Sequence, residues 1–144
     1  MRVTLAKFCD YACHVDGGKS TLIGMFDTIG GATFPLVHPT LFICVELEFQ
    51  PIEGGRPVEV KLVLIDEDGK EMFGVQGQFE APRGNARPAT LMQAFRIDNM
   101  AFPKPGAYRL DVMEGDQQIG EALLYLVQGA PPGQPGGGQG FGPA

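Results

Sequence analysis

The sequence predicts an all-β protein whose strands form a single antiparallel sandwich of seven to nine strands. Three observations lead to this fold class. Gly (21 residues) and Pro (12 residues) interrupt the 144-residue chain and leave only short stretches, such as 89–102, free of both. Long helices therefore have little room. Apolar and polar residues alternate with a period of two, and Gly-containing turn signals separate the alternating segments.

The N-terminal third fits a hairpin followed by a loop. Residues 2–9 are rich in β-forming side chains, and residues 15–19 (VDGGK) have turn composition. We expect residues 20–29 to return as the second strand. Residues 30–39 (GGATFPLVHP) are predicted to form a longer loop that His-Pro closes before the next strand.

Two central segments alternate most clearly. Residues 41–49 place five apolar side chains on one face and two glutamates on the other, which is typical of a half-buried strand. Residues 57–66 follow the same pattern. They run into Asp68-Gly69, a strong hairpin signal, and residues 71–80 are predicted to return.

The C-terminal part predicts two further strands. Residues 107–113 alternate, and residues 114–117 (EGDQ) form a turn. The last strand, 118–127, is apolar enough that we expect it to be buried on both faces.

A corner before residue 108 refines the fold class. Apolar alternation ends in Asn-Met, then a Pro/Gly corner, then Gly106 and Tyr108 at the start of a strand. This resembles the strand E to strand F corner of immunoglobulin-like domains, where a tyrosine hydroxyl bonds back to upstream backbone. Gly106 and Tyr108 are therefore predicted to form this structural corner. No cysteine lies near Tyr108 and the chain has no Trp, so the sandwich is immunoglobulin-like in architecture only.

Composition divides the chain in two. Residues 129–144 contain only Gly, Pro, Ala, Gln and one Phe, and they carry no charge. Such a segment cannot bury enough apolar surface to offset its ordering entropy, so we predict a disordered tail after a 1–128 domain.

Charge and cysteine content predict the surroundings of the protein. A net charge of −6 argues against nucleic acid and anionic membranes, and Arg83, Arg87 and Arg96 are expected to be solvated surface charges. The three cysteines are an odd number, and no signal-peptide h-region or apolar run of about 20 residues is present. These features predict reduced thiols and a cytoplasmic location.

Residues 13–21 (CHVDGGKST) end like a phosphate-binding loop, and 62–67 (LVLIDE) look like its Walker B partner. The first glycine of such a loop is replaced by Cys13, and the glycines after Ser20 leave no room for the helix that must follow. We therefore predict a hairpin turn in which Gly17-Gly18 supply positive φ angles and Lys19 is solvated.

Other chemistry has little support in the sequence. Cys9 and Cys13 are about 13 Å apart in an extended strand, too far for one metal, and Cys44 faces away from the core. His14 and His38 belong to no recognisable triad. The acidic turns 66–68 and 114–116 are explained by hairpin chemistry. We expect no catalytic residue, no metal and no cofactor.

The segment LAKFCDYACHVDGGKSTLIGMFD, with Gly24, Phe26 and Asp27, resembles the N-terminal pattern of a family of short bacterial proteins of unknown function. Further matching positions are Phe34-Pro35, His38-Pro39, Asp68–Lys70, Pro105–Tyr108 and Ile119-Gly120. The resemblance implies a compact immunoglobulin-like β-sandwich and brings no known activity, ligand or catalytic residue.

The predicted function is a non-enzymatic, cytoplasmic protein-binding or assembly module, with a protein partner or a second copy bound through a sheet face, edge strand or loop. Asp16, Lys19, Asp27 and His38, in the opening hairpin and the 28–40 loop, are the candidate interaction residues. Two alternatives stay open. One is a small-ligand or carbohydrate-binding domain, and the other is a metal-dependent or redox-sensing protein that uses Cys9, Cys13 and His14.

Overall fold

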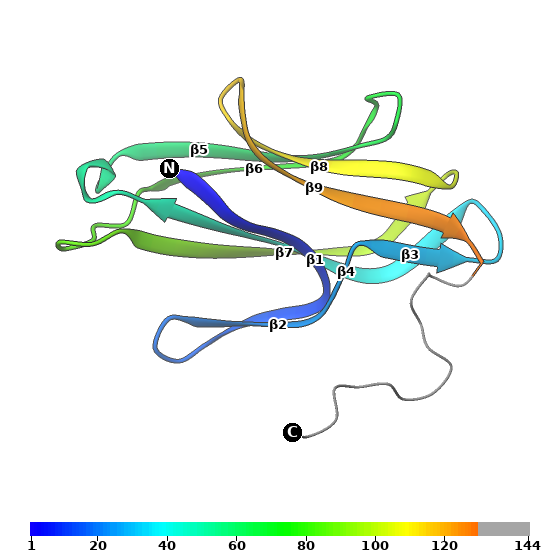
Figure 1. Ribbon diagram of the computed structural model, residues 1–144, viewed down its shortest axis with the longest axis horizontal. Coiled ribbons are helices and arrows are strands. Elements are labelled where there is room, and N and C mark those ends of the chain that lie inside the picture. The colour runs from blue at the N-terminus through cyan, green and yellow to red at the C-terminus, as the bar shows by residue number, and fades with distance from the viewer. Residues whose placement is uncertain (130–144) are drawn as a thin grey trace, which may run out of the picture.

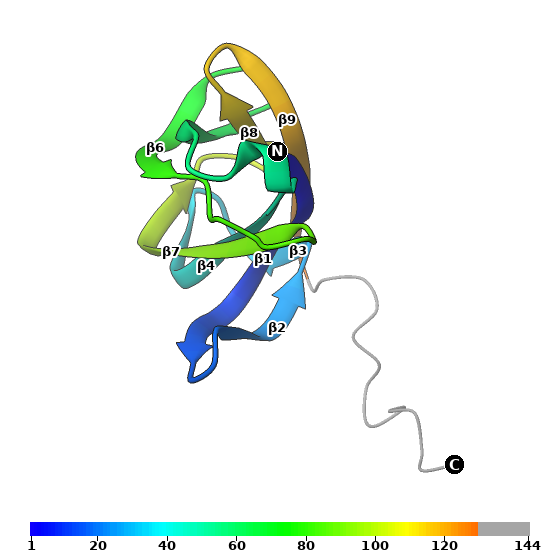
Figure 2. The ribbon, with the colours of Figure 1, turned by 90° about the vertical axis from the view of Figure 1, so that its left-hand side faces the viewer.

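A computed structural model describes residues 1–129 as nine strands in two sheets that pack face to face (Figures 1 and 2). One sheet has the order β2-β1-β4-β7 and the other the order β3-β9-β8-β5-β6. The predicted all-β sandwich and its number of strands are confirmed. The predicted tail, apart from Gly129, lies outside the described residues. The elements are β1 (Arg2–Val15), β2 (Lys19–Phe26), β3 (Thr28–Gly31), β4 (Leu36–Phe49), the 3₁₀ turn η1 (Pro51–Glu53), β5 (Pro57–Ile65), β6 (Glu71–Glu80), β7 (Ala89–Phe102), β8 (Gly106–Glu114) and β9 (Gln117–Gln128).

The predicted strand 20–29 is two strands in different sheets. The chain leaves β2 at Asp27, whose carbonyl accepts a 2.7 Å hydrogen bond from the Tyr125 N–H, and β3 then pairs in parallel with β9. The prediction of a single returning strand was wrong because this pairing joins segments almost a hundred residues apart.

The predicted loop 30–39 was also wrong. β4 already begins at Leu36, and its first residues continue the pairing with β7, so that His38 lies opposite Met100. Pro39 does not end the strand, since the pairing with β7 continues on both sides of it, at His38 and Thr40. His38 is therefore a strand residue and not a loop residue.

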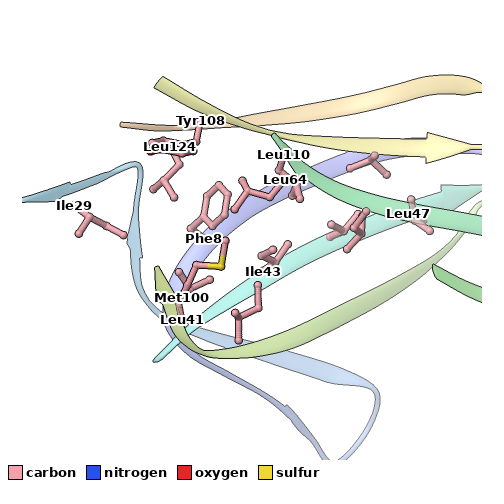
Figure 3. Packing of buried hydrophobic residues seen from close by; sticks show 14 of the residues in the cluster. Phe8, Ile29, Leu41, Ile43, Leu47, Leu64, Met100, Tyr108, Leu110 and Leu124 are labelled. Carbon is pink, nitrogen blue, oxygen red and sulfur yellow. The ribbon is translucent and has the colours of Figure 1, made fainter. Parts of the chain in front are cut away.

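The core lies between the two sheets. Leu41, Ile43 and Leu47 of β4 meet Leu64, Leu110 and Leu124 of the opposite sheet, as Figure 3 shows. The Phe102 and Tyr108 rings pack edge to face with their centroids 5.2 Å apart. Each fully buried side chain of this size contributes about 1.5–3 kcal/mol to folding, so this core is the main source of stability.

The last strand differs from its prediction. Leu124 and Leu126 of β9 are buried, but Leu123 and Tyr125 are 42% and 40% exposed. The strand alternates because only one of its faces meets the opposite sheet. The prediction that β9 is buried on both faces was wrong.

The corner before β8 is held by three contacts. The Tyr108 hydroxyl donates a 2.7 Å hydrogen bond to the Lys104 carbonyl, as expected for a tyrosine corner. The Glu67 carboxylate accepts a 2.8 Å hydrogen bond from the Ala107 N–H, and the Lys104 ammonium lies 3.3 Å from the Asp68 carboxylate. The acidic β5–β6 turn is thus joined to the β7–β8 corner.

Candidate functional site

The β1–β2 hairpin extends past the rest of its sheet. β1 pairs with β4 only as far as Cys9 opposite Phe42, whereas its pairing with β2 continues to Val15 opposite Lys19. We call residues 10–25 the hairpin arm, and Figure 2 shows it projecting from the sandwich. A two-stranded ribbon of this kind is marginally stable alone, so it needs contacts on at least one face.

Those contacts come from a second buried cluster outside the main core, which we call the outer cluster. Its members are Cys9, Ala12, Phe42 and Cys44, with Leu22, Met92 and Ala94 packed around them. β4 alternates between the two cores, since Ile43 and Val45 belong to the main core while Phe42 and Cys44 belong to the outer cluster. The arm is thereby attached to the sheet at its base through Ala12 and Leu22.

The outer cluster brings two thiols together. The sulfur atoms of Cys9 and Cys44 are 3.5 Å apart, and both residues are fully buried. Burial, and then the neighbouring Cys9 thiol, raise the pKa of Cys44 to about 12. A thiol with so high a pKa is a poor nucleophile and a poor metal ligand at neutral pH. The sequence placed Cys44 away from the core side of β4 but missed this pair, because its two members are 35 residues apart.

The burial of these thiols makes a prediction about their reactivity. In folded protein at pH 8, a disulfide reagent such as DTNB should label about one thiol rapidly, namely the partly exposed Cys13. All three should react once guanidinium unfolds the chain. The Cys13→Ser variant should lose the rapid phase. Rapid labelling of Cys9 or Cys44 in the folded state, identified by mass spectrometry, would contradict the buried geometry.

The arm also exposes large apolar side chains. Among residues 1–129, eight large hydrophobic residues are exposed, and four of them, Tyr11, Val15, Ile23 and Met25, belong to β1 and β2 within the arm. Tyr11 lies opposite Ile23, and Met25 lies opposite Cys9. Ile23 is 54% and Met25 59% exposed. Single exposed apolar residues are ordinary, but four of them on one projecting two-stranded hairpin indicate a binding surface.

An irregularity in the pairing shapes the arm between these residues. Gly24 has a φ of +65° and does not pair with Asp10, although the residues on both sides of them pair with one another. A Cβ on Gly24 would lie 2.4 Å from an Asp10 carboxylate oxygen, so a larger residue would displace that side chain. The register is the same on both sides of this point, so the break is confined to Asp10 and Gly24.

The four predicted interaction residues do not share one loop. Asp16 lies in the turn at the tip of the arm and Lys19 begins β2 there. Asp27 follows β2 at its other end, about 26 Å from the tip at ~3.3 Å per residue. His38 lies near that end too, since its ring centroid is 6.0 Å from that of Phe26. The prediction of a 28–40 loop is corrected to two strands, β3 and the start of β4.

The segment that resembles a phosphate-binding loop, residues 13–21, forms a hairpin turn. Gly17 and Gly18 have φ angles of +83° and +72°, and Ser20 lies in β2. Residues 62–65 of the Walker B resemblance lie inside β5. Within residues 1–129, the one helical element is the three-residue turn η1, so no helix N-terminus follows Lys19.

The other candidate sites are occupied by structural contacts. In the β5–β6 turn, an Asp66 carboxylate oxygen accepts hydrogen bonds from the N–H groups of Asp68 and Lys70. Glu114 binds the Arg56 guanidinium at 2.6 Å. No group of three or more possible metal ligands occurs in the part of the chain that the structure describes. The same residues include no helix long and apolar enough to cross a membrane.

Comparison with known proteins gives a family without a function. A family model described as "Family of unknown function (DUF6941)" matches residues 4–127, which include all nine strands except the ends of β1 and β9. No curated protein matches the sequence.

Proposed function

Because the chain belongs to this family of unknown function, we propose from its geometry that it is a non-catalytic protein-binding module and that the hairpin arm is its docking element. The observation that carries the proposal is the row of exposed apolar side chains on a projecting hairpin whose outer strand, β2, is the edge of its sheet.

The strand order indicates that the arm is an addition to an immunoglobulin-like sandwich. In one sheet, the order β1-β4-β7 is that of strands A, B and E of an immunoglobulin-like sandwich. In the other sheet, the order β9-β8-β5-β6 is that of strands G, F, C and C′. β2 has no counterpart in that order. Its residues Ile23 and Met25 are mostly exposed and contribute little to the core, so burial within the sandwich does not account for them.

An edge strand offers a partner main-chain hydrogen bonds as well as apolar contacts. β2 pairs with β1 on one side only, so its other side presents N–H and C=O groups to which an extended segment can add. The net charge of −6 favours a basic partner and disfavours a second copy of this chain. We therefore propose a different protein, with an extended, apolar and basic segment, as the occupant.

The free thiols support the proposed cytoplasmic location. Cys9 and Cys44 are free thiols although their sulfurs are 3.5 Å apart, and disulfides are rare in reducing compartments.

The experiment compares two matched variants in a pull-down from the native organism. Ile23→Lys changes the arm, and Leu123→Lys makes the same change at a similarly exposed apolar site on the other sheet. Ile23 is 54% and Leu123 42% exposed, so a lysine at either position can place its ammonium group in solvent, and both variants should fold with nearly unchanged melting temperatures. We expect wild type and Leu123→Lys to recover a partner in stoichiometric amount. Ile23→Lys should recover at least tenfold less of it.

Two results would overturn the proposal. One is equal recovery of the partner by Ile23→Lys and Leu123→Lys, which would place binding elsewhere. The other is concentration-dependent dimerisation of the wild type that Ile23→Lys abolishes, measured by sedimentation, which would make a second copy the occupant.

A further inference from the structure

We propose that the open side of the sandwich holds a binding site for a small, neutral, mainly apolar molecule with one hydroxyl or amide group. The site is a cleft of about 210 Å³ between the two sheets, lined from β4, β5, β6 and β7. Its walls are mostly apolar, and the lining residues on which the argument depends are Val60, Val75, Gly77, Gln93 and Phe95. It is remote in the fold from the hairpin arm and independent of the function proposed for that arm.

The cleft lies where the sandwich is not closed. β6 is the last strand of one sheet and β7 the last strand of the other. On the opposite side, β1 approaches β9 so closely that a Cβ on Gly120 would lie 2.9 Å from Val3. Close contact on one side and two edge strands on the other leave the space between β6 and β7 accessible.

Gly77 leaves part of the cleft wall without a side chain. Gly77 lies opposite Val60, and Val75 lies opposite Leu62, so Gly77 occupies the inward-facing register of β6. A Cβ on Gly77 would meet nothing within 4 Å. Gly77 is itself exposed, so the cleft is open to solvent at this point, and a larger side chain here would narrow it.

One polar group lies among the inward positions of β7. Gln93 pairs with the buried Val45, and its neighbours in the same register, Leu91 and Phe95, are apolar and pack against the core. An amide offers both N–H donors and a carbonyl acceptor. Ligand sites combine mostly apolar walls with a few polar groups of this kind that fix orientation.

Size and charge define the ligand. An apolar cavity of roughly 150 Å³ accepts benzene, so 210 Å³ suits a molecule of about eight or nine non-hydrogen atoms. None of the residues that line the cleft is charged, so nothing there would compensate a buried ionic headgroup. A neutral medium-chain alcohol or amide matches both properties.

The test titrates the full-length protein with 1-octanol, octanoate and benzene and follows the amide NMR signals. We expect saturable shifts around the cleft with 1-octanol, with a Kd of about 0.1–1 mM, and binding of octanoate at least fivefold weaker. Gly77→Leu should raise the Kd for 1-octanol at least tenfold. Gln76→Leu, which adds the same side chain on the outward register of β6, should leave it unchanged.

A second variant keeps the test decisive if Gly77→Leu does not fold. Gln93→Leu preserves the apolar walls, so benzene binding should persist while the preference for 1-octanol over benzene falls. The proposal is overturned if 1-octanol gives no saturable shifts up to its solubility limit, or if folded Gly77→Leu binds as tightly as wild type. An unchanged preference for 1-octanol in Gln93→Leu would overturn the role of the amide.

Discussion

Tyr108→Ala is expected to lower the free energy of unfolding by about 3–5 kcal/mol, because it empties one of the largest fully buried positions in the core. Tyr108→Phe keeps the ring and its edge-to-face packing on Phe102, and it removes only the 2.7 Å hydrogen bond to the Lys104 carbonyl. The smaller change should therefore cost about 1 kcal/mol.

Urea unfolding of the two variants and the wild type, followed by circular dichroism, measures both differences. The matched pair separates the packing of the ring from the hydrogen bond of the hydroxyl. Equal stability of Tyr108→Phe and wild type would show that the corner does not depend on the hydroxyl. A loss below about 1 kcal/mol in Tyr108→Ala would contradict the buried position of the ring.

Gly106→Ala is expected to destabilise the protein by about 3 kcal/mol. Gly106 has a φ of +147°, which side chains rarely adopt, and such backbone costs about 1–3 kcal/mol. A Cβ there would also lie 2.7 Å from the Glu67 carboxylate oxygen that accepts the Ala107 N–H hydrogen bond. The carboxylate must move, and a charge-assisted hydrogen bond is worth about 1.5–3 kcal/mol.

Gly115→Ala provides the matched control. Gly115 also has a positive φ, +58°, but a Cβ there would meet nothing within 4 Å. Gly115→Ala should lower the free energy of unfolding by only about 1 kcal/mol, the ordinary penalty for a side chain in the left-handed region. Thermal unfolding measures the loss of stability in both variants. Equal losses in Gly106→Ala and Gly115→Ala would refute the steric argument.

Much of the fold could be predicted from local sequence. The alternation in residues 57–65 and 71–80 and the Asp68-Gly69 turn between them define one hairpin, because strand period and turn chemistry act over a few residues. The corner at Gly106 and Tyr108 was predictable for the same reason, since its hydrogen bond spans four residues.

The candidate sites were harder to predict. The exposed row of Tyr11, Ile23 and Met25 has the composition of an ordinary strand, and only the end of β1–β4 pairing at Cys9 shows that the arm extends past the sheet. The cleft at Gly77 depends on which face of β6 meets the opposite sheet. A glycine within a strand gives no sign of that from the sequence.

By itself, therefore, the sequence determined the all-β class, most of the strands and turns and the tyrosine corner, because each depends on interactions between near neighbours in the chain. Only the tertiary structure decided that β3 joins the second sheet beside β9, that Cys9 meets Cys44, and that His38 lies in a strand. It also decided where apolar surface stays exposed. These features depend on pairing between segments that are distant in the chain, which is set by the packing of the whole sandwich and leaves no local pattern.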